Sequence, residues 1–499
     1  MHTRQARVVR FAPIAALVLA GVLPLRAQVP SPAPAPARTL TLQEAIALAE
    51  RQGVAAEAAR DARDAARWRD RAFNARLLPQ FSIGGNVLNL NRGINPILQP
   101  EGNTLLLRQR QTTSQMGLTV AQPVPWSGTE FTVSSLVTRY EDLGANDVTT
   151  RYWQTQPVVL GIRQDIFRPR RLLWDQRQQD ISAQIFERQY LEAREDIAGI
   201  TAGAFFDYYA ADVALTNASA NAAVNDTLYR LNTGRYEVGK IGENDLLQSE
   251  LALLRARTSL DGAKLERDRA EAALRRLVNL PVGQPIAVVP PKEIPSMQVD
   301  PEMAVKQALA NASATEQIEL DAVVAKRHIA EARYNNGFGA TVSAQIGVNQ
   351  TATAFGDAYQ APLPRQSVLL GIEMPFFQWG GGRADLQAAR AEQSRVQSSA
   401  RARRDAMEED ARFAALQLAQ TARVLAISAK ADTVASKRFE VAKNRYVIGK
   451  IGISDLYIGQ NEKDQAVVAY VQALRAYWTA YYRLRRLTLY DFAENREIQ

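Results

Sequence analysis

Side chains that could act as nucleophiles, metal ligands or general bases are scarce in this sequence of 499 residues. It contains no cysteine, which excludes a disulfide, a thiolate metal site, a thiol nucleophile and the acylated cysteine of a lipoprotein. Of its two histidines, His2 lies at the start of the chain and His328 stands in an alanine-rich helical stretch, where a surface or packed histidine is expected. The composition therefore predicts no metal site and no cofactor.

Motifs of common enzymes are also missing from the sequence. It has no Gly-x-Ser-x-Gly elbow and no phosphate-binding loop. Acidic pairs such as Glu408 and Glu409 lie in the middle of a predicted long helix, where exposed charge is the simpler interpretation. The sequence therefore predicts a protein that is not an enzyme.

The most distinctive polar motif occurs twice. Arg-Tyr-x-x-Gly-Lys-Ile-Gly-x-x-Asp-Leu begins at Arg235 and again at Arg445. Glycine is expected where a helix reverses tightly, because it adopts backbone angles that other residues resist. Asp245 and Asp455 follow the two turns, where each could cap the next helix or bind a partner group. Both roles remain open at this point.

The motif belongs to a duplication that covers most of the chain. Three separated blocks keep one offset of 210 residues, and they begin at Gly161, Arg235 and Leu274. The opening helices, at Ala45 and Ala304, are instead 259 residues apart, so the first repeat holds about 49 extra residues within 84–151. We divide the chain into a first structural repeat, 39–285, and a second, 286–499.

Each repeat is predicted to contain a helix of about 35 residues, a strand-rich region, a very long helix, a Gly-containing turn and a further helix. The long helices, from about Arg171 to Arg235 and from about Ala384 to Arg445, contain no proline. Each would span roughly 90 to 100 Å, which exceeds a compact domain. Small apolar residues recur along the second one at steps of three and four, which indicates a coiled-coil seam.

The strand-rich regions, about 80–165 and about 340–377, show a two-residue alternation instead. Met116, Leu118 and Val120, for example, alternate with small or polar residues. Strands with one apolar and one polar face, flanked by aromatic residues, are typical of a membrane β-barrel, while a soluble sheet packed on one face is the alternative. One chain offers four to six strands, too few to close a pore, so a barrel would be shared among identical chains.

The N-terminal residues are typical of an exported protein. Residues 1–27 resemble a signal peptide, with arginines before an apolar run and Ala27 as a small residue for cleavage. A Pro/Ala-rich linker at 28–38 favours an extended chain. Without the leader's four arginines the formal charge of +8 falls to about +4. Acids and bases are interspersed along the remaining chain, so nucleic-acid binding is not expected.

Together, the leader, the duplication, the strand pairs between helices and the two turn motifs resemble the TolC-like outer-membrane efflux protein family. The resemblance covers nearly the whole mature chain. Its most specific marks are the paired Tyr-x-x-Gly turns at one offset and the Phe-Phe-x-x-Gly-Gly passage from Phe376 to Gly381, which is similar to the family's strand-to-helix crossover.

The resemblance implies an α+β membrane protein in which three chains form a transmembrane β-barrel continued by a long periplasmic α-helical coiled-coil barrel. The two Gly turns would form the periplasmic tip. By resemblance, an adaptor protein's helical hairpin docks there on Val238, Gly239, Lys240, Gly242, Ile448, Gly449, Lys450 and Gly452.

In the family the same tip closes the pore through bonds among tyrosine, aspartate and arginine. Tyr446, Asp245 and Asp455 match such positions. Ile451 stands where the arginine is expected, and Lys450 is the nearest cation. The resemblance therefore implies a gate whose details differ from the family pattern.

The expected function is that of an outer-membrane channel subunit of a tripartite efflux or type I secretion system, which conducts solutes passively from periplasm to exterior. Its expected partners are two further copies of the chain, a periplasmic adaptor, an inner-membrane pump and outer-membrane lipid. The alternative is a wholly periplasmic coiled-coil adaptor or scaffold with a soluble sheet. The exported substrate and the pump are not identified by the sequence.

Overall fold

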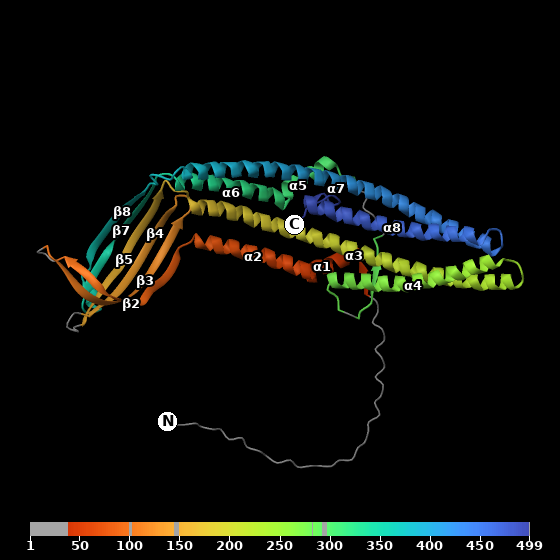
Figure 1. The fold of residues 1–499 in the computed structure, drawn as a ribbon, viewed down its shortest axis with the longest axis horizontal. Helices are drawn as coiled ribbons and strands as arrows, with labels where there is room; N and C mark the ends of the chain where they lie inside the picture. Colours follow the sequence, from red (N-terminus) through yellow and green to blue (C-terminus); the bar gives the residue numbers. More distant parts are fainter. Residues whose placement is uncertain (1–37, 99–101, 144–148, 282, 292–296, 499) are drawn as a thin grey trace, which may run out of the picture.

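The computed structural model describes residues 38–98, 102–143, 149–281, 283–291 and 297–498. The predicted signal peptide and linker, up to residue 37, lie outside the described residues. The molecule is long and narrow, with a β-sheet at one end and a bundle of long helices that runs away from it to two turns at the other end (Figure 1).

The described helices confirm the predicted long rods. They are α1 (Leu42–Gln52), α2 (Val54–Arg76), α3 (Arg171–Glu237), α4 (Glu243–Leu277), α5 (Pro301–Asn311), α6 (Ser313–Asn335), α7 (Gly381–Val447) and α8 (Ile453–Thr488). Helices α3 and α7 have 67 residues each, which corresponds to about 100 Å. None of the described helices has an apolar stretch long enough to cross a membrane.

The opening helix of each repeat differs from the prediction, because it is broken in two. The predicted 35 residues are divided between α1 and α2 by Gly53, and the matching break between α5 and α6 falls at Ala312. Both residues have φ −67° and ψ 142°, an extended conformation. The alanine at the second break shows that these angles do not require glycine, but at Gly53 a Cβ would lie 2.4 Å from the Ala49 carbonyl oxygen and 2.9 Å from that of Leu277, so a larger residue there would displace backbone.

The sheet contains six antiparallel strands in the order β2-β3-β4-β5-β7-β8. They are β2 (Gln80–Leu98), β3 (Thr104–Val124), β4 (Thr129–Leu143), β5 (Thr149–Ile166), β7 (Gly339–Ala352) and β8 (Leu363–Glu373). The first repeat therefore contributes four strands and the second two. Both strand-rich regions fall where the alternation predicts them.

The extra residues of the first repeat form the hairpin of β3 and β4. Strand β2 follows α2 as β7 follows α6, and β5 precedes α3 as β8 precedes α7. The two inserted strands pair from Gln111↔Asp142 to Val124↔Thr129. The extra residues therefore form an added hairpin, and its two strands lie inside the sheet between β2 and β5.

The register of the six strands places the apolar residues on one face. One row across five strands pairs Phe81 with Val120, Val120 with Val133, Val133 with Leu160, and Leu160 with Ile346. The same face carries further apolar residues on every strand, namely Ile83, Met116, Leu118, Phe131, Ile162, Val342, Val368, Leu370 and Ile372. The opposite face is mostly small or polar, with Ser82, Thr119, Thr132, Ser134, Gly161, Ser343 and Gln345. The predicted two-faced strands are confirmed.

The main hydrophobic core lies midway along the helices. It joins α1 and α5 to α3, α4, α7 and α8, with Phe205, Phe206, Leu274 and Tyr477 at its centre. Short strands β1 (Arg38–Thr41) and β6 (Ile286–Val289) pair in parallel beside it. Since β1 opens the first repeat and β6 opens the second, this pairing joins the two repeats beside the short helices α1 and α5, a region that we call the belt.

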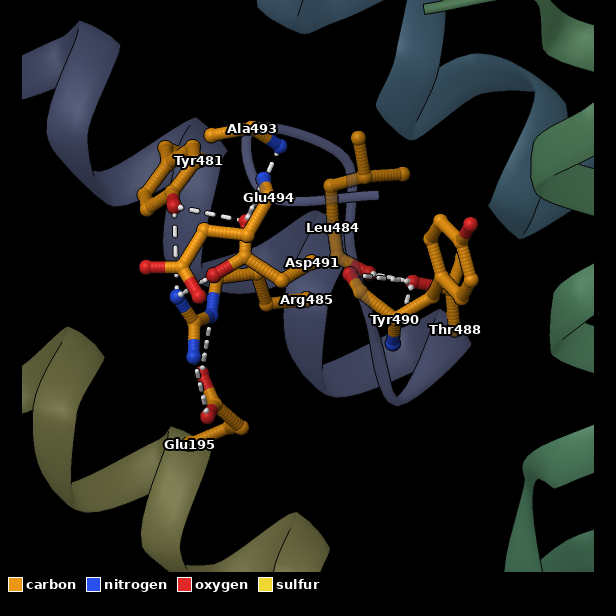
Figure 2. Close-up of polar contacts among 9 residues, drawn as sticks. All are labelled: Glu195, Tyr481, Leu484, Arg485, Thr488, Tyr490, Asp491, Ala493 and Glu494. Atoms are coloured by element: carbon orange, nitrogen blue, oxygen red, sulfur yellow. Dashed lines mark hydrogen bonds and ion pairs between the residues drawn. The ribbon is translucent and has the colours of Figure 1, made fainter. Parts of the chain in front are cut away.

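A buried charge network fastens the end of the chain to this core (Figure 2). The Arg485 guanidinium donates to both oxygens of Glu195, at 2.8 and 3.0 Å, and to Asp491 Oδ2 at 2.7 Å. Burial opposes the charge of Arg485, but its hydrogen bonds to Glu195 and that residue's charge outweigh burial and raise its pKa above the ordinary value. Asp491 also accepts the backbone N–H groups of Ala493 and Glu494, so α3, α8 and the C-terminal hairpin of β9 (Tyr490–Asp491) and β10 (Arg496–Glu497) are linked.

Replacing Arg485 with alanine is expected to lower the free energy of unfolding by about 3 to 5 kcal/mol, because the Glu195 carboxylate is 3% exposed and would lose its partner. The measurement is thermal loss of helical circular dichroism in the purified protein. Arg486→Ala is the matched control, since the Arg486–Asp196 pair is nearly half exposed and contributes at most about 1 kcal/mol. Equal losses in the two variants would contradict a structural role for the buried network.

Candidate functional site

The two Gly turns lie side by side at the end of the helices that is farthest from the sheet (Figure 1). One joins α3 to α4 through residues 238–242, and the other joins α7 to α8 through residues 448–452. We call this end the helical tip. The duplicated motif is thus brought together in space, although its two copies are 210 residues apart in the sequence.

The two turns have the same backbone geometry. Gly239 has φ +71° and Gly449 has φ +74°, in the left-handed region that favours glycine. The Gly239 N–H donates to the Tyr236 carbonyl at 2.8 Å and the Lys240 N–H donates to the Arg235 carbonyl at 2.8 Å, and the second turn repeats both bonds. This pair of bonds is a Schellman motif, which satisfies the last carbonyls of α3 and α7.

The predicted docking residues are all on the surface of the tip. Val238 and Ile448 hold equivalent positions and are 67% and 65% exposed. Lys240 and Lys450 follow the positive-φ glycines and are exposed as well. An exposed valine, an exposed isoleucine and two lysines therefore lie on two adjacent turns, where a partner could contact them.

The aspartates do not cap the helices that follow. The N-cap positions are Gly242 and Gly452, and neither helix start has a side-chain cap. Asp245 and Asp455 lie in the first turns of α4 and α8, where a negative charge interacts favourably with the positive end of the helix dipole. Asp455 is exposed and Asp245 half-buried, and neither carboxylate has a hydrogen bond or ion pair within the described residues.

Tyr446 lies in the interior of the tip, where it joins the two hairpins. Its ring is 5% exposed, and its hydroxyl donates to Asn232 Oδ1 on α3 at 2.9 Å. The Arg235 guanidinium lies over the same ring at 5.4 Å and donates to the Val447 carbonyl. Tyr446 therefore clamps α7 to α3 within one chain. Tyr236, its counterpart in the first repeat, is 42% exposed.

An apolar cluster supports this clamp. Its members come from α3, α7 and α8, namely Leu228, Phe439, Tyr446, Ile453 and Leu456. Ile451 packs against the cluster at the position where the family resemblance implies an arginine. The tip therefore has a hydrophobic contact where an ion pair is expected from the resemblance.

One contributor to the tip, Asn232, was not singled out from the sequence, and Arg235 was recognised only as part of the duplicated motif. The only local signal for Asn232 is a polar residue on the buried stripe of α3, four residues after Leu228. Further along the same stripe, a cavity of about 430 Å³ between α3, α4 and α8 is lined by Asn225 and Gln460, and both have a buried side-chain oxygen without a partner. Burial raises the pKa of Tyr457, beside this cavity, to about 12, so its hydroxyl remains protonated at neutral pH.

Acidic side chains do not gather into a metal site anywhere in the described part of the chain. In particular, no three His, Cys, Asp or Glu residues meet in an arrangement that could hold a metal ion. The chemistry available at the tip is therefore hydrogen bonding, charge and apolar contact.

Tyr446→Phe is expected to destabilise the tip by about 1 to 3 kcal/mol, because Asn232 is fully buried and its amide nitrogen already lacks a partner. Hydrogen exchange of the last turns of α7 should accelerate by about fivefold for each kcal/mol lost. Tyr236→Phe is the control, since it removes an exposed hydroxyl at the equivalent position of the other turn. If both variants exchange like the wild type, the clamp contributes nothing to stability.

Comparison with known proteins yields matches to solved structures. No family model and no curated protein sequence matches the chain. The CmeC outer membrane channel of Campylobacter jejuni is similar over 92% of this chain and 86% of its own, with a TM-score of 0.63 and 15% identity. The outer membrane protein VceC of Vibrio cholerae is similar over 92% and 97%, with a TM-score of 0.64 and 14% identity.

The outer-membrane channel OprN gives a comparable result, with a TM-score of 0.64, 14% identity and coverage of 91% of this chain and 90% of its own. At identities this low, the structural similarity establishes the fold but does not by itself transfer a function. The agreement extends over the sheet, the long helices and both hairpins, because nine-tenths of each chain is superposed. The protein therefore has the fold of the TolC-like outer-membrane channels.

Proposed function

We propose that the protein is one subunit of a homotrimeric outer-membrane channel that conducts solutes passively out of the periplasm. The observation that supports this most directly is the apolar face of the six-stranded sheet. Large apolar side chains on this face are exposed on every strand, for example Phe81 at 75%, Val368 at 78% and Ile372 at 64%. A continuous exposed apolar surface of this kind requires a lipid or protein partner.

The dimensions of this face suit a bilayer. Along β5 the face extends from Trp153 to Ile162, about 30 Å of strand, and a tilt of about 40° reduces this to roughly 23 Å. Aromatic residues lie at both ends. Trp153 contacts Phe355 at the far end, while Trp126 and Trp379 are exposed at the end near the helices. Aromatic belts at the two interfaces are typical of transmembrane barrels.

The sheet has two open edges, β2 and β8. Unpaired backbone groups are costly in lipid, so each edge needs a partner strand. Pairing β8 of one chain with β2 of the next in a ring of three closes a barrel of eighteen strands, because each chain supplies six. The interior is then lined by the polar face.

The long helices continue this ring into the periplasm, and the helical tip is the end that meets other components. We assign docking of a periplasmic adaptor to the turns at Val238 to Gly242 and Ile448 to Gly452, with an inner-membrane pump supplying the energy. Gating is assigned to Asp245, Asp455 and Tyr446 at the same tip. The exposed turn residues and the partnerless aspartates support these assignments.

The alternative of a periplasmic scaffold without a pore is less compatible with the sheet. A soluble sheet would cover one face with helices or a second sheet. Here the helices leave from one end of the sheet and cover neither face (Figure 1). The exposed apolar face therefore favours the membrane channel.

Val368→Arg is expected to prevent assembly in the outer membrane, because it places a charge near the middle of the proposed lipid-facing surface at a cost of about 2 to 4 kcal/mol. Leu369→Arg is the matched control, since the neighbouring side chain points to the opposite face and is 65% exposed. Heat-modifiable trimer in outer-membrane fractions is the measurement. Equal assembly of the two variants, or recovery of the wild type in the soluble periplasm, would favour the scaffold.

Purified protein in planar bilayers is expected to show small, mostly closed conductance. Replacing Asp245 and Asp455 with alanine should raise the open fraction, because these carboxylates are proposed to hold the tips together. The control is Asp261→Ala, which removes an exposed acid on α4 that pairs with Lys264. Unchanged conductance in the double variant would remove the gate assignment while leaving the channel intact.

A further inference from the structure

The two crossovers from strand to long helix differ in a way that the duplication makes visible. Between β5 and α3 the chain reads Arg168-Pro169-Arg170-Arg171, whereas the equivalent positions between β8 and α7 read Gln378-Trp379-Gly380-Gly381. Both segments perform the same structural task, because each links the last strand of its repeat to a 67-residue helix. Three arginines at one crossover and none at the other are therefore not required by the fold.

The basic crossover borders a cavity of about 550 Å³ between the end of β5, the start of α3 and the end of α6. Its walls combine apolar and cationic groups. Phe167, Trp174 and Tyr334 supply aromatic surface, while Arg170 and Arg177 supply charge. Arg170, Trp174 and Arg177 are spaced four and three residues apart at the start of α3, so they share one face of the helix. The cavity therefore suits a molecule that is both anionic and apolar.

The nearby acids leave Arg170 and Arg177 without an ion pair among the residues that the structure describes. Glu373 pairs with Arg168, and Asp175 pairs with Arg327 at 2.6 Å. Asp165, which also lines the cavity, accepts a hydrogen bond from Thr341 and lies 3.9 Å from the Arg163 guanidinium. Neither Arg170 nor Arg177 has an ion pair within the described residues, although the Arg177 guanidinium lies over the Trp174 ring at 5.6 Å. Two exposed guanidinium groups are thus available to an anion.

The cavity also adjoins the apolar face of the sheet. Gln164 and Ile166 line it, and they continue the two-residue alternation of Leu160 and Ile162 along β5. The first turn of α3 contains no acidic residue, so the positive end of the helix dipole adds to the arginine charge. A ligand in the cavity can therefore place its charged group against α3 and its apolar part along the proposed lipid-facing surface.

We propose that this cavity binds the headgroup of an anionic glycerophospholipid from the leaflet on the helical side of the membrane. Arg170 and Arg177 bind the phosphate, and Phe167 and Trp174 contact the glycerol and upper acyl chains. The proposal rests on the proposed membrane location. A small soluble anion would use the arginines but not the aromatic walls, so the cavity as a whole favours the lipid.

The test is native mass spectrometry of the purified full-length protein in detergent, with phosphatidylglycerol and phosphatidylcholine of identical acyl chains added in equal amounts. The wild type is expected to retain phosphatidylglycerol about five- to tenfold more strongly, a difference of roughly 1 to 1.4 kcal/mol. Arg170→Gln with Arg177→Gln should reduce this preference to less than about twofold. Arg383→Gln, an exposed arginine at the start of α7, should leave it unchanged.

Arg177→Lys provides a second arm that retains the charge and should keep most of the preference, whether or not the double variant folds. Equal retention of the two lipids by the wild type would overturn the proposal, as would a full preference in a folded double variant. Conductance and trimer assembly of the same preparations distinguish a failure of the lipid site from a failure of the proposed channel function. A protein that forms channels but shows no lipid preference contradicts only the lipid site, whereas one that forms no channel contradicts the proposed function.

Discussion

The register of one antiparallel sheet determines most of what this molecule can do. Side chains alternate across each strand, so a shift of one residue between neighbours would scatter the apolar groups over both faces. The pairs from Phe81 through Val120, Val133 and Leu160 to Ile346 keep them together. Where a strand departs from regular pairing, as between Asn86 and Asn89, an extra residue in β2 restores the same face beyond it.

The long helices α3 and α7 must also stay in register with each other and with their neighbours over their whole length. Alanine on the buried stripes, such as Ala411, Ala414 and Ala415 of α7, allows close approach but provides little to distinguish one register from the next. Polar contacts at two positions along the bundle specify a single register. Arg485 binds Glu195 at the belt, and Tyr446 binds Asn232 at the tip, and both join α3 to the second hairpin. Their hydrogen-bond geometry tolerates no sliding.

The duplication produced two similar hairpins whose residues then serve different purposes. Tyr446 is buried against Asn232, whereas Tyr236 at the equivalent position is exposed. The crossover after β5 is basic, and the crossover after β8 is aromatic and glycine-rich. In the proposed ring of three chains, these features would alternate around the circumference. Comparing equivalent positions of the two repeats therefore isolates the effect of the side chain, because the backbone geometry is shared.

Features that arise from local periodicity could be predicted from the amino-acid sequence. The 3.6-residue and two-residue patterns located the long helices and both strand regions, and the matched turns around Gly239 and Gly449 followed from the need for positive φ. The constant offset also identified the extra residues of the first repeat, although not their pairing within the sheet.

Features that depend on distant partners could be recognised only in the folded chain. At Gly53, a Cβ would lie 2.9 Å from the Leu277 carbonyl oxygen, which comes from a distant helix. The burial of Tyr446 and its bond to Asn232 join residues 214 positions apart, and the Arg485–Glu195 pair joins residues 290 apart. A local pattern carries no information on such pairs, because each side chain's environment is set by which helix face packs against it. For the same physical reason the sequence pattern does not predict the pairing of β5 with β7, because these strands come from different repeats and meet only when both repeats fold together.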